Sequence, residues 1–141
     1  MRGPHIVPLD DSHLDAAADL LARQQVAWRQ NRPELPQRFT DAAATKPLIG
    51  AQLEAAGAHG IAAFDGGDML AFLLGAPRLE PIWNRAAWSP IEGQAIDPGA
   101  DRDILRDVYA AWSEHWIERG VFFHYVHAPA DDRAGQDAWF D

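Results

Sequence analysis

The sequence predicts a mixed α/β domain, and three stretches of the chain carry that prediction. Residues 88–127 contain an apolar strand, a Pro/Gly/Asp turn, an amphipathic helix and a second apolar strand, the pattern of a parallel βαβ unit. Residues 61–74 place two apolar runs around Asp-Gly-Gly-Asp, the pattern of a tight hairpin. Residues 14–28 repeat apolar side chains at helical spacing. These patterns together predict antiparallel and parallel strands combined with amphipathic helices.

The first strand and the first helix are predicted near the N-terminus. Residues 5–9 (HIVPL) are typical of a short strand, and Pro8 restricts it to a sheet edge or a strand end. Ser12 followed by Asp15 resembles a capping box, so a helix is expected from this point to about Asn31.

A second helical segment is expected after the proline-rich loop 32–38. Thr40 or Asp41 can cap it, because both side chains accept a hydrogen bond from a helix N-terminus. Pro47 lies inside this segment and is expected to kink or divide it, because proline lacks the N–H of the helical ladder. Gly57 is expected to end it.

The hairpin turn at Asp65–Asp68 requires positive φ, which Asp-Gly supplies. After the hairpin we expect an irregular connection rich in Pro and Trp. The expected elements from there on are the connection 76–87, the strand 88–96, the helix 104–119, the strand 121–127 and a further helix starting in 131–141.

The composition is that of one acidic domain. A length of 141 residues suits a single domain, and 48% hydrophobic residues are enough to form a core. The formal charge of −9 repels phosphate backbones and anionic lipid, so we expect no nucleic acid and no membrane partner. The chain has no cysteine and no apolar run typical of a signal peptide or a membrane span. A cytoplasmic location is expected.

The order of elements resembles that of the GCN5-related N-acetyltransferase (GNAT) family. The residues that carry the likeness are the hairpin turn 65–66, the strand 88–96, the helix-to-strand junction 119–121 and the final 138–140, which resembles the start of the family's Y-x-x-x-G-F segment. The resemblance implies an α+β fold, a three-layer α/β arrangement with a mostly antiparallel sheet, a central parallel βαβ unit and helices on both faces. It implies a single acyl-CoA N-acyltransferase domain over 1–141 that lacks the last strands and is incomplete at its C-terminus.

The same resemblance implies acetyl-CoA as cofactor. The family motif [RQ]-x-x-G-x-[GA] follows the fourth strand and holds the pyrophosphate with backbone N–H groups, and here the position reads DPGADR. Backbone donors from Ile96 to Gly99, Asp97 among them, are expected to orient the cofactor. Gly99, Ala100 and Arg102 are expected near the pyrophosphate.

The residue types in this turn conflict with the motif. Pro98 has no N–H, and Asp97, Asp101 and Asp103 bring negative charge to a place where a pyrophosphate needs positive potential. A purely structural interpretation also explains the acids, since Asp101 can cap the helix and Asp103 can complement its dipole. The turn therefore predicts a weakened cofactor site.

Glu92 is the candidate general base, because the family carries a carboxylate on its fourth strand that takes the proton from the amine. Gly93 permits a bulge of the kind that separates the fourth and fifth strands. The alternative is that Glu92 is a solvent-facing strand residue. For the general acid there is no good candidate, because the family's tyrosine is replaced by Trp139 and Phe140.

Histidines and tryptophans also have structural interpretations. His124 and His127 are three residues apart on a strand and so face opposite sides, which argues against a shared metal ion. Trp112 and Trp116 are four apart on a helix and are expected to pack in the core. Trp88, with Trp83, is expected at a subunit contact or in an acceptor pocket.

Two functions follow from these observations. The first is an acyl-CoA-dependent N-acetyltransferase acting on a small-molecule or peptide amine. The second is a catalytically inert domain of the same fold that serves assembly or binds a regulatory ligand. In both, the last strand is expected to expose an edge with Phe122 or Phe123, so we expect a homo-oligomer or the remainder of a longer tandem-domain chain.

Overall fold

The computed structural model describes residues 4–80 and 84–127. It contains six strands, three α-helices and three short 3₁₀ helices. The strands are β1 (His5–Pro8), β2 (His59–Asp65), β3 (Asp68–Glu80), β4 (Asn84–Ser89), β5 (Gln94–Ile96) and β6 (Phe123–Val126). The helices are η1 (Asp11–His13), α1 (Leu14–Arg29), η2 (Gln37–Thr40), α2 (Ala42–Glu54), η3 (Ile91–Gly93) and α3 (Asp103–Glu118).

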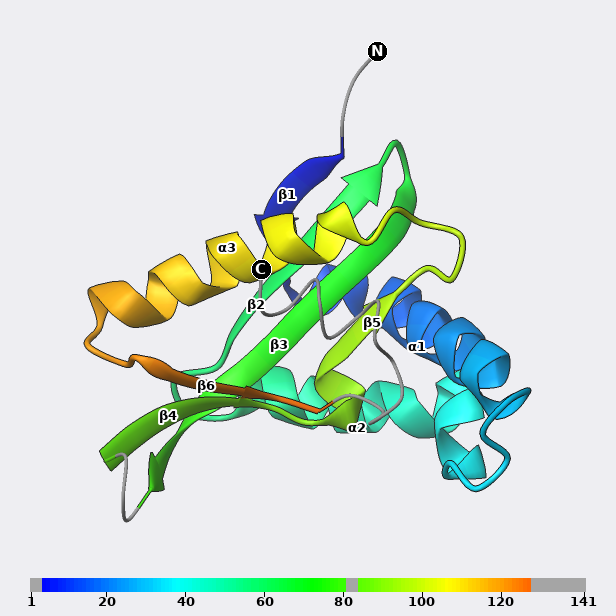
Figure 1. Ribbon diagram of the computed structural model, residues 1–141, viewed down its shortest axis with the longest axis horizontal. Helices are drawn as coiled ribbons and strands as arrows, with labels where there is room; N and C mark the ends of the chain where they lie inside the picture. The colour runs from blue at the N-terminus through cyan, green and yellow to red at the C-terminus, as the bar shows by residue number, and fades with distance from the viewer. Residues whose placement is uncertain (1–3, 81–83, 128–141) are drawn as a thin grey trace.

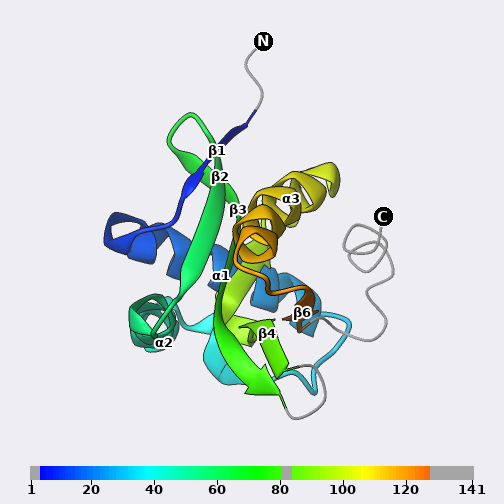
Figure 2. The same ribbon diagram turned by 90° about the vertical axis from the view of Figure 1, so that its left-hand side faces the viewer.

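The strands form one mixed sheet in the order β1-β2-β3-β4-β6, with β5 also paired to β3 (Figure 1). Among the described strands, β4 and β6 are the parallel pair, and the other pairs are antiparallel. Helices α1 and α2 cover one face and α3 covers the other, as Figure 2 shows edge-on. The three-layer α+β architecture expected from the sequence is confirmed.

Two cores lie on opposite faces of the sheet, and the alternation of side chains along β3 divides them. Phe72 and Leu74 of β3 pack in the core beneath α1 and α2. Leu73 packs on the other face against Trp112 and Trp116 of α3, which are 0% and 1% exposed. The two tryptophans are core residues, as their spacing predicts. The Trp112 indole N–H donates to the His59 carbonyl oxygen at 3.0 Å, which satisfies its buried polar atom.

The helix starts differ in part from the expected ones. Asp10, and not Ser12, caps the first helical region: its carboxylate accepts from the Ser12 amide at 2.9 Å, because η1 precedes α1. Asp41 caps α2 by accepting from the Ala43 amide at 3.0 Å. The expected break at Pro47 is wrong, since α2 runs unbroken through it. Proline removes one hydrogen bond near the start of the helix, and the burial of the later turns around Ile49 compensates for it.

The expected irregular connection at 76–87 is also wrong. Residues 76–80 extend β3, and Asn84–Ser89 return antiparallel beside them as β4. Pro77 is tolerated there because β2 pairs with β3 only as far as Gly75, so β4 is the one described strand beside Pro77. Trp83, the final residues 138–140 and the helix expected in 131–141 lie outside the described residues.

The hairpin between β2 and β3 forms at the expected place. Asp65 pairs with Asp68 across a two-residue turn, and Gly66 has a φ of 60°, a conformation that glycine adopts without strain. At the other end of the sheet, Phe122 just before the edge strand β6 and Phe123 at its start are exposed, with exposed fractions of 67% and 42%. Within the described ranges, no helix is long and apolar enough to cross a membrane.

Candidate functional site

The strand expected at 88–96 is split in two by the short helix η3. β4 pairs with the far end of β3, with Ala76 opposite Trp88, whereas β5 pairs nearer its start, with Leu73 opposite Gln94. The intervening residues leave the ladder as a 3₁₀ turn, closed by the Gly93 amide donating to the Pro90 carbonyl at 2.9 Å. At Gly93, where a bulge is expected, the strand is interrupted by a whole 3₁₀ turn.

Gly93 is required for this turn by close packing. A Cβ at this position would overlap the Leu74 carbonyl oxygen and lie 2.8 Å from the Ser89 hydroxyl oxygen. Only glycine lets the backbone of η3 approach β3 so closely. The split of the strand is thus encoded at a single residue.

Among the described strands, β6 pairs with β4 alone, in parallel. The last backbone contact is the His127 amide, which donates to the Ser89 carbonyl at 3.2 Å. Beyond it, the Gln94 side-chain amide donates to the His127 carbonyl in place of a backbone ladder. β5 therefore has β3 on one side and, among the described strands, none on the other. Among the described residues, the two halves of the split strand therefore differ: β4 pairs with β6, and β5 does not.

Helix α1 supplies a partner to the open side of β5. The Ile96 amide, which faces away from β3, donates to the side-chain oxygen of Gln24 at 2.8 Å. Gln24 is 3% exposed, so this contact satisfies two buried polar groups together.

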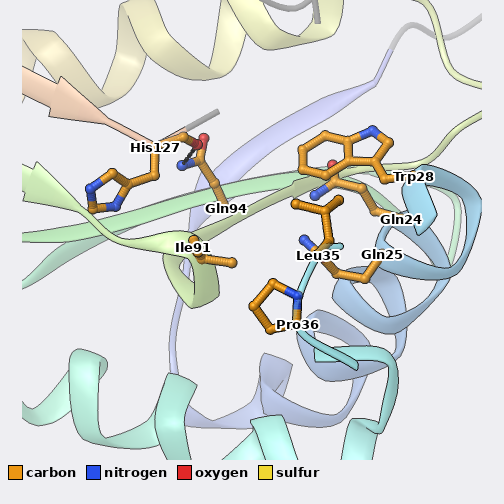
Figure 3. A pocket seen from close by; sticks show the side chains of 8 residues that line it. All are labelled: Gln24, Gln25, Trp28, Leu35, Pro36, Ile91, Gln94 and His127. Carbon is orange, nitrogen blue, oxygen red and sulfur yellow. Dashed lines mark hydrogen bonds between the residues drawn. The ribbon is translucent and has the colours of Figure 1, made fainter. Parts of the chain in front are cut away.

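A pocket of about 230 Å³ opens beside η3 and β5 (Figure 3). Its lining comes from α1, the α1–η2 loop, η3, β5 and the end of β6. The apolar members are Trp28, Leu35, Pro36 and Ile91, and the polar members are Gln24, Gln25, Gln94 and His127. Arg29 donates to the Leu35 carbonyl and so fastens the loop that forms one wall.

Glu92, the expected base, lies in η3 and not in a strand, because the strand is interrupted there. It is partly buried and follows Ile91, which lines the pocket. Glu92 itself is not among the residues that line the pocket.

The turn between β5 and α3 is held by its own carboxylates. One oxygen of Asp97 accepts from the Gly99 amide at 2.9 Å, and the other pairs with the Arg23 guanidinium at 3.1 Å. The Asp97 carbonyl accepts from the Ala100 amide at 2.9 Å. Asp101 accepts from the Asp103 amide at 2.9 Å and thereby caps α3.

This turn does not fit a diphosphate in its present conformation. The expected donors Ile96, Gly99 and Ala100 each bond to a protein oxygen, and Pro98 has none to offer. An incoming diphosphate would have to displace the charged Asp97 acceptor from Gly99, and the charge repulsion adds to that cost. Arg102 precedes the first residue of α3 without a side-chain cap bond.

A second polar cluster lies on the α3 face of the sheet. The Tyr109 hydroxyl oxygen lies 2.9 Å from His124 Nδ1, and His124 Nε2 lies 3.0 Å from the Val121 carbonyl. Because a carbonyl only accepts, Nε2 holds the proton and Tyr109 donates to Nδ1. Burial raises the pKa of Tyr109. His124 faces α3 and His127 lines the pocket on the α1 side, the opposite orientations that their spacing predicts.

No protein-family model and no curated protein matches the sequence. Solved structures do match. A probable acetyltransferase superposes with a TM-score of 0.72 at 14% identity, covering 96% of this chain and 85% of that one. A GCN5-related N-acetyltransferase from Ralstonia eutropha JMP134 gives 0.66 at 19% identity, covering 97% and 89%. This chain has the GNAT fold.

A third similar structure carries information on ligands. The aminoglycoside N-acetyltransferase AAC(6')-Iy, in complex with the bisubstrate analogue CoA-S-monomethyl-acetylneamine, gives a TM-score of 0.64 at 16% identity and covers 96% of this chain and 86% of that one. At such identities the likeness establishes the GNAT fold, and the ligands belong to the neighbour.

The sequence interpretation named none of the eight residues that line the pocket as a site residue. The available signal was a pair of glutamines, at 24 and 25, on the helix face that carries the buried stripe of α1. A buried polar side chain on an apolar face needs a partner, and here that partner is the unpaired edge of β5.

Proposed function

We propose that this protein is an N-acyltransferase that transfers the acyl group of an acyl-CoA, acetyl-CoA in the simplest case, to a small amine. The observation that carries the proposal is the edge of β5 that no described strand pairs, next to a pocket. This edge of β5 is proposed to bind one extended ligand, and the cavity on the α1 side is proposed to bind a second ligand. The GNAT-fold neighbours, acetyltransferases by name, support the same activity.

The amine is proposed to occupy the pocket, and Glu92 is proposed to take its proton. Acyl-CoA, when bound, supplies an activated acyl thioester. The contribution of this chain is to hold the amine and make it nucleophilic, which requires a base within hydrogen-bond reach of the amine, directly or through water. Glu92 is the carboxylate of η3, the turn that also contributes Ile91 to the pocket wall.

The cofactor residues proposed from the sequence are kept as a conditional assignment: Ile96, Asp97, Gly99, Ala100 and Arg102. They lie together from the end of β5 to the start of α3. The Gly99 amide becomes available to an anionic ligand only when the Asp97 carboxylate turns away from it, whereas the Ile96, Asp97 and Ala100 amides bond to other protein oxygens. Arg102 lies in this turn, and Arg23 reaches it from α1 through its ion pair with Asp97.

A second candidate function is a catalytically inert GNAT-fold domain that binds a regulatory ligand or takes part in assembly. The specific observation in its favour is the turn closed by Asp97 and Asp101. The exposed Phe122 and Phe123, at the beginning of edge strand β6, supply an apolar surface for a second copy of the chain.

Calorimetric titration with acetyl-CoA separates the two candidates. The acyltransferase proposal expects saturable heat of binding and release of the CoA thiol when an amine is added. Absence of heat and of any thermal shift at millimolar ligand rejects it and leaves the inert domain.

A further inference from the structure

The apolar part of the pocket is shaped by flat and rigid groups. Trp28 from α1 faces the cavity with its indole, and Leu35 and Pro36 come from the loop that follows α1 (Figure 3). Ile91 closes the opposite side from η3. A tryptophan face and a proline ring favour a planar, apolar ligand body, because both offer a flat surface at little cost in conformational entropy.

Three of the four polar residues that line the pocket are glutamines, which carry no charge. Gln24, Gln25 and Gln94 are 3%, 2% and 6% exposed, so their carboxamides are held in place. Among the described lining residues there is no aspartate, glutamate, lysine or arginine. Carboxamide oxygens can accept from one amino group. A ligand with several buried ammonium groups would lack the carboxylates that compensate for lost hydration.

The aromatic surface continues past the pocket along the same face of the sheet. The ring of His127, which lines the pocket, lies 6.3 Å from Trp88. Trp88 stacks on Tyr125 at 4.5 Å, and the Arg78 guanidinium lies 4.4 Å above the Trp88 ring. Flat groups are therefore found on both sides of the cavity, at Trp28 and beyond His127.

From this lining we infer that the pocket binds an arylalkylamine, a single amino group on a planar apolar body, and discriminates against polycations. The inference rests on the proposed function in taking the pocket as the amine site. It differs from the aminoglycoside-derived ligand named for the neighbour AAC(6')-Iy, because this pocket lacks carboxylates among its described residues. Binding of the amine needs no acyl donor, so it can be measured by itself.

The test is calorimetric titration with 2-phenylethylamine and, separately, with the polycation neamine, in about 0.15 M salt to screen the acidic surface. Phenylethylamine is expected to bind saturably and at least about tenfold more tightly than neamine. Trp28→Ala is expected to weaken phenylethylamine binding by about tenfold, through loss of the aromatic wall. Val26→Ala is the matched control, because Val26 lies on the same helix, is 50% exposed and does not line the pocket.

Three results overturn the inference: no binding of phenylethylamine, equal or tighter binding of neamine, or unchanged binding in Trp28→Ala. If Trp28→Ala does not fold, the indole N–H resonance of Trp28 in the unaltered protein, assigned with Trp28→Phe, is followed instead. It is expected to shift on addition of phenylethylamine, and a stationary resonance counts against the site. Amine binding without acetyl-CoA turnover would reject the acyltransferase proposal and leave the pocket assignment standing.

Discussion

On the α1 side of the sheet the split strand borders an open pocket, whereas at the far end of β5 the turn into α3 is closed by its own carboxylates. Both regions depend on backbone amides that the sheet leaves without a strand partner. In the pocket the neutral side chain of Gln24 accepts a hydrogen bond from the Ile96 amide. In the turn the charged Asp97 carboxylate accepts a hydrogen bond from the Gly99 amide and forms an ion pair with Arg23. The comparison shows that one fold can leave a pocket open on one side of a strand while the amides of the following turn are satisfied internally.

The largest expected effect concerns the pocket side. If Glu92 accepts the amine proton, Glu92→Gln reduces kcat by about 10²-fold or more, the usual contribution of a general base. Acetyl-CoA binding and the melting temperature are expected to stay nearly unchanged, because Glu92 lies in η3, outside the turn from β5 to α3, and glutamine has almost the same shape. Steady-state kinetics with circular dichroism checks this.

Glu114→Gln on the exposed face of α3 provides the matched control for the same chemical change. Equal activity in the two variants would remove Glu92 from the mechanism.

A second prediction tests whether the split strand itself defines the pocket. Gly93→Ala is expected to lower the free energy of unfolding by about 1–3 kcal/mol, since the added methyl group overlaps the Leu74 carbonyl. Gly67→Ala introduces the same methyl group where no atom lies within 4 Å, and a change within about 0.5 kcal/mol is expected there. Denaturant unfolding of both variants measures the contrast, and similar losses would mean that η3 tolerates a side chain.

The third prediction opens the closed turn. Asp97→Ala frees the Gly99 amide and removes one negative charge, so we expect CoA to bind about tenfold more tightly. Asp107→Ala removes an equal charge from an exposed position within α3 and controls for the general field. Calorimetry measures the CoA affinity of both variants. The same gain in affinity in both would mean that Asp97 acts only through the net charge.

The smallest expected effect lies on the α3 face, away from both regions. His59 stacks on His115 with ring centroids 3.7 Å apart, and burial, followed by the charges of His115 and Arg119, lowers the pKa of His59 to about 4. A depressed histidine pKa favours the neutral form in the fold. Its stabilising effect is present above the unfolded value near 6.5 and is lost as pH falls from there toward 4.

After discounting for partial solvent exposure, we expect acidification across this range to cost about 1 kcal/mol of unfolding free energy through His59. His59→Gln is expected to flatten this dependence, and His5→Gln, at an exposed position in β1, is expected to leave it intact. Unfolding measured near neutrality and near pH 4.5 tests both variants. An unaltered pH slope in His59→Gln would contradict the assignment.

Local patterns determined much of this molecule. Gly66 marks the hairpin and Asp41 marks the start of α2, because each of these features depends on neighbouring backbone alone. The carboxylates of the turn before α3 were also visible, and their conflict with the anion motif follows from residue type.

Only the tertiary structure decided the rest. The strands at 76–80 and 84–87 exist because each supplies the other's hydrogen bonds, which no local pattern records and which override the proline within them. The pocket brings Trp28 from α1 together with His127 from the end of β6. The bond between Gln24 and Ile96 spans 72 residues of sequence. Periodicity and turn chemistry report short-range preferences. A pocket lined by several elements depends instead on which distant residues the packed layers place side by side.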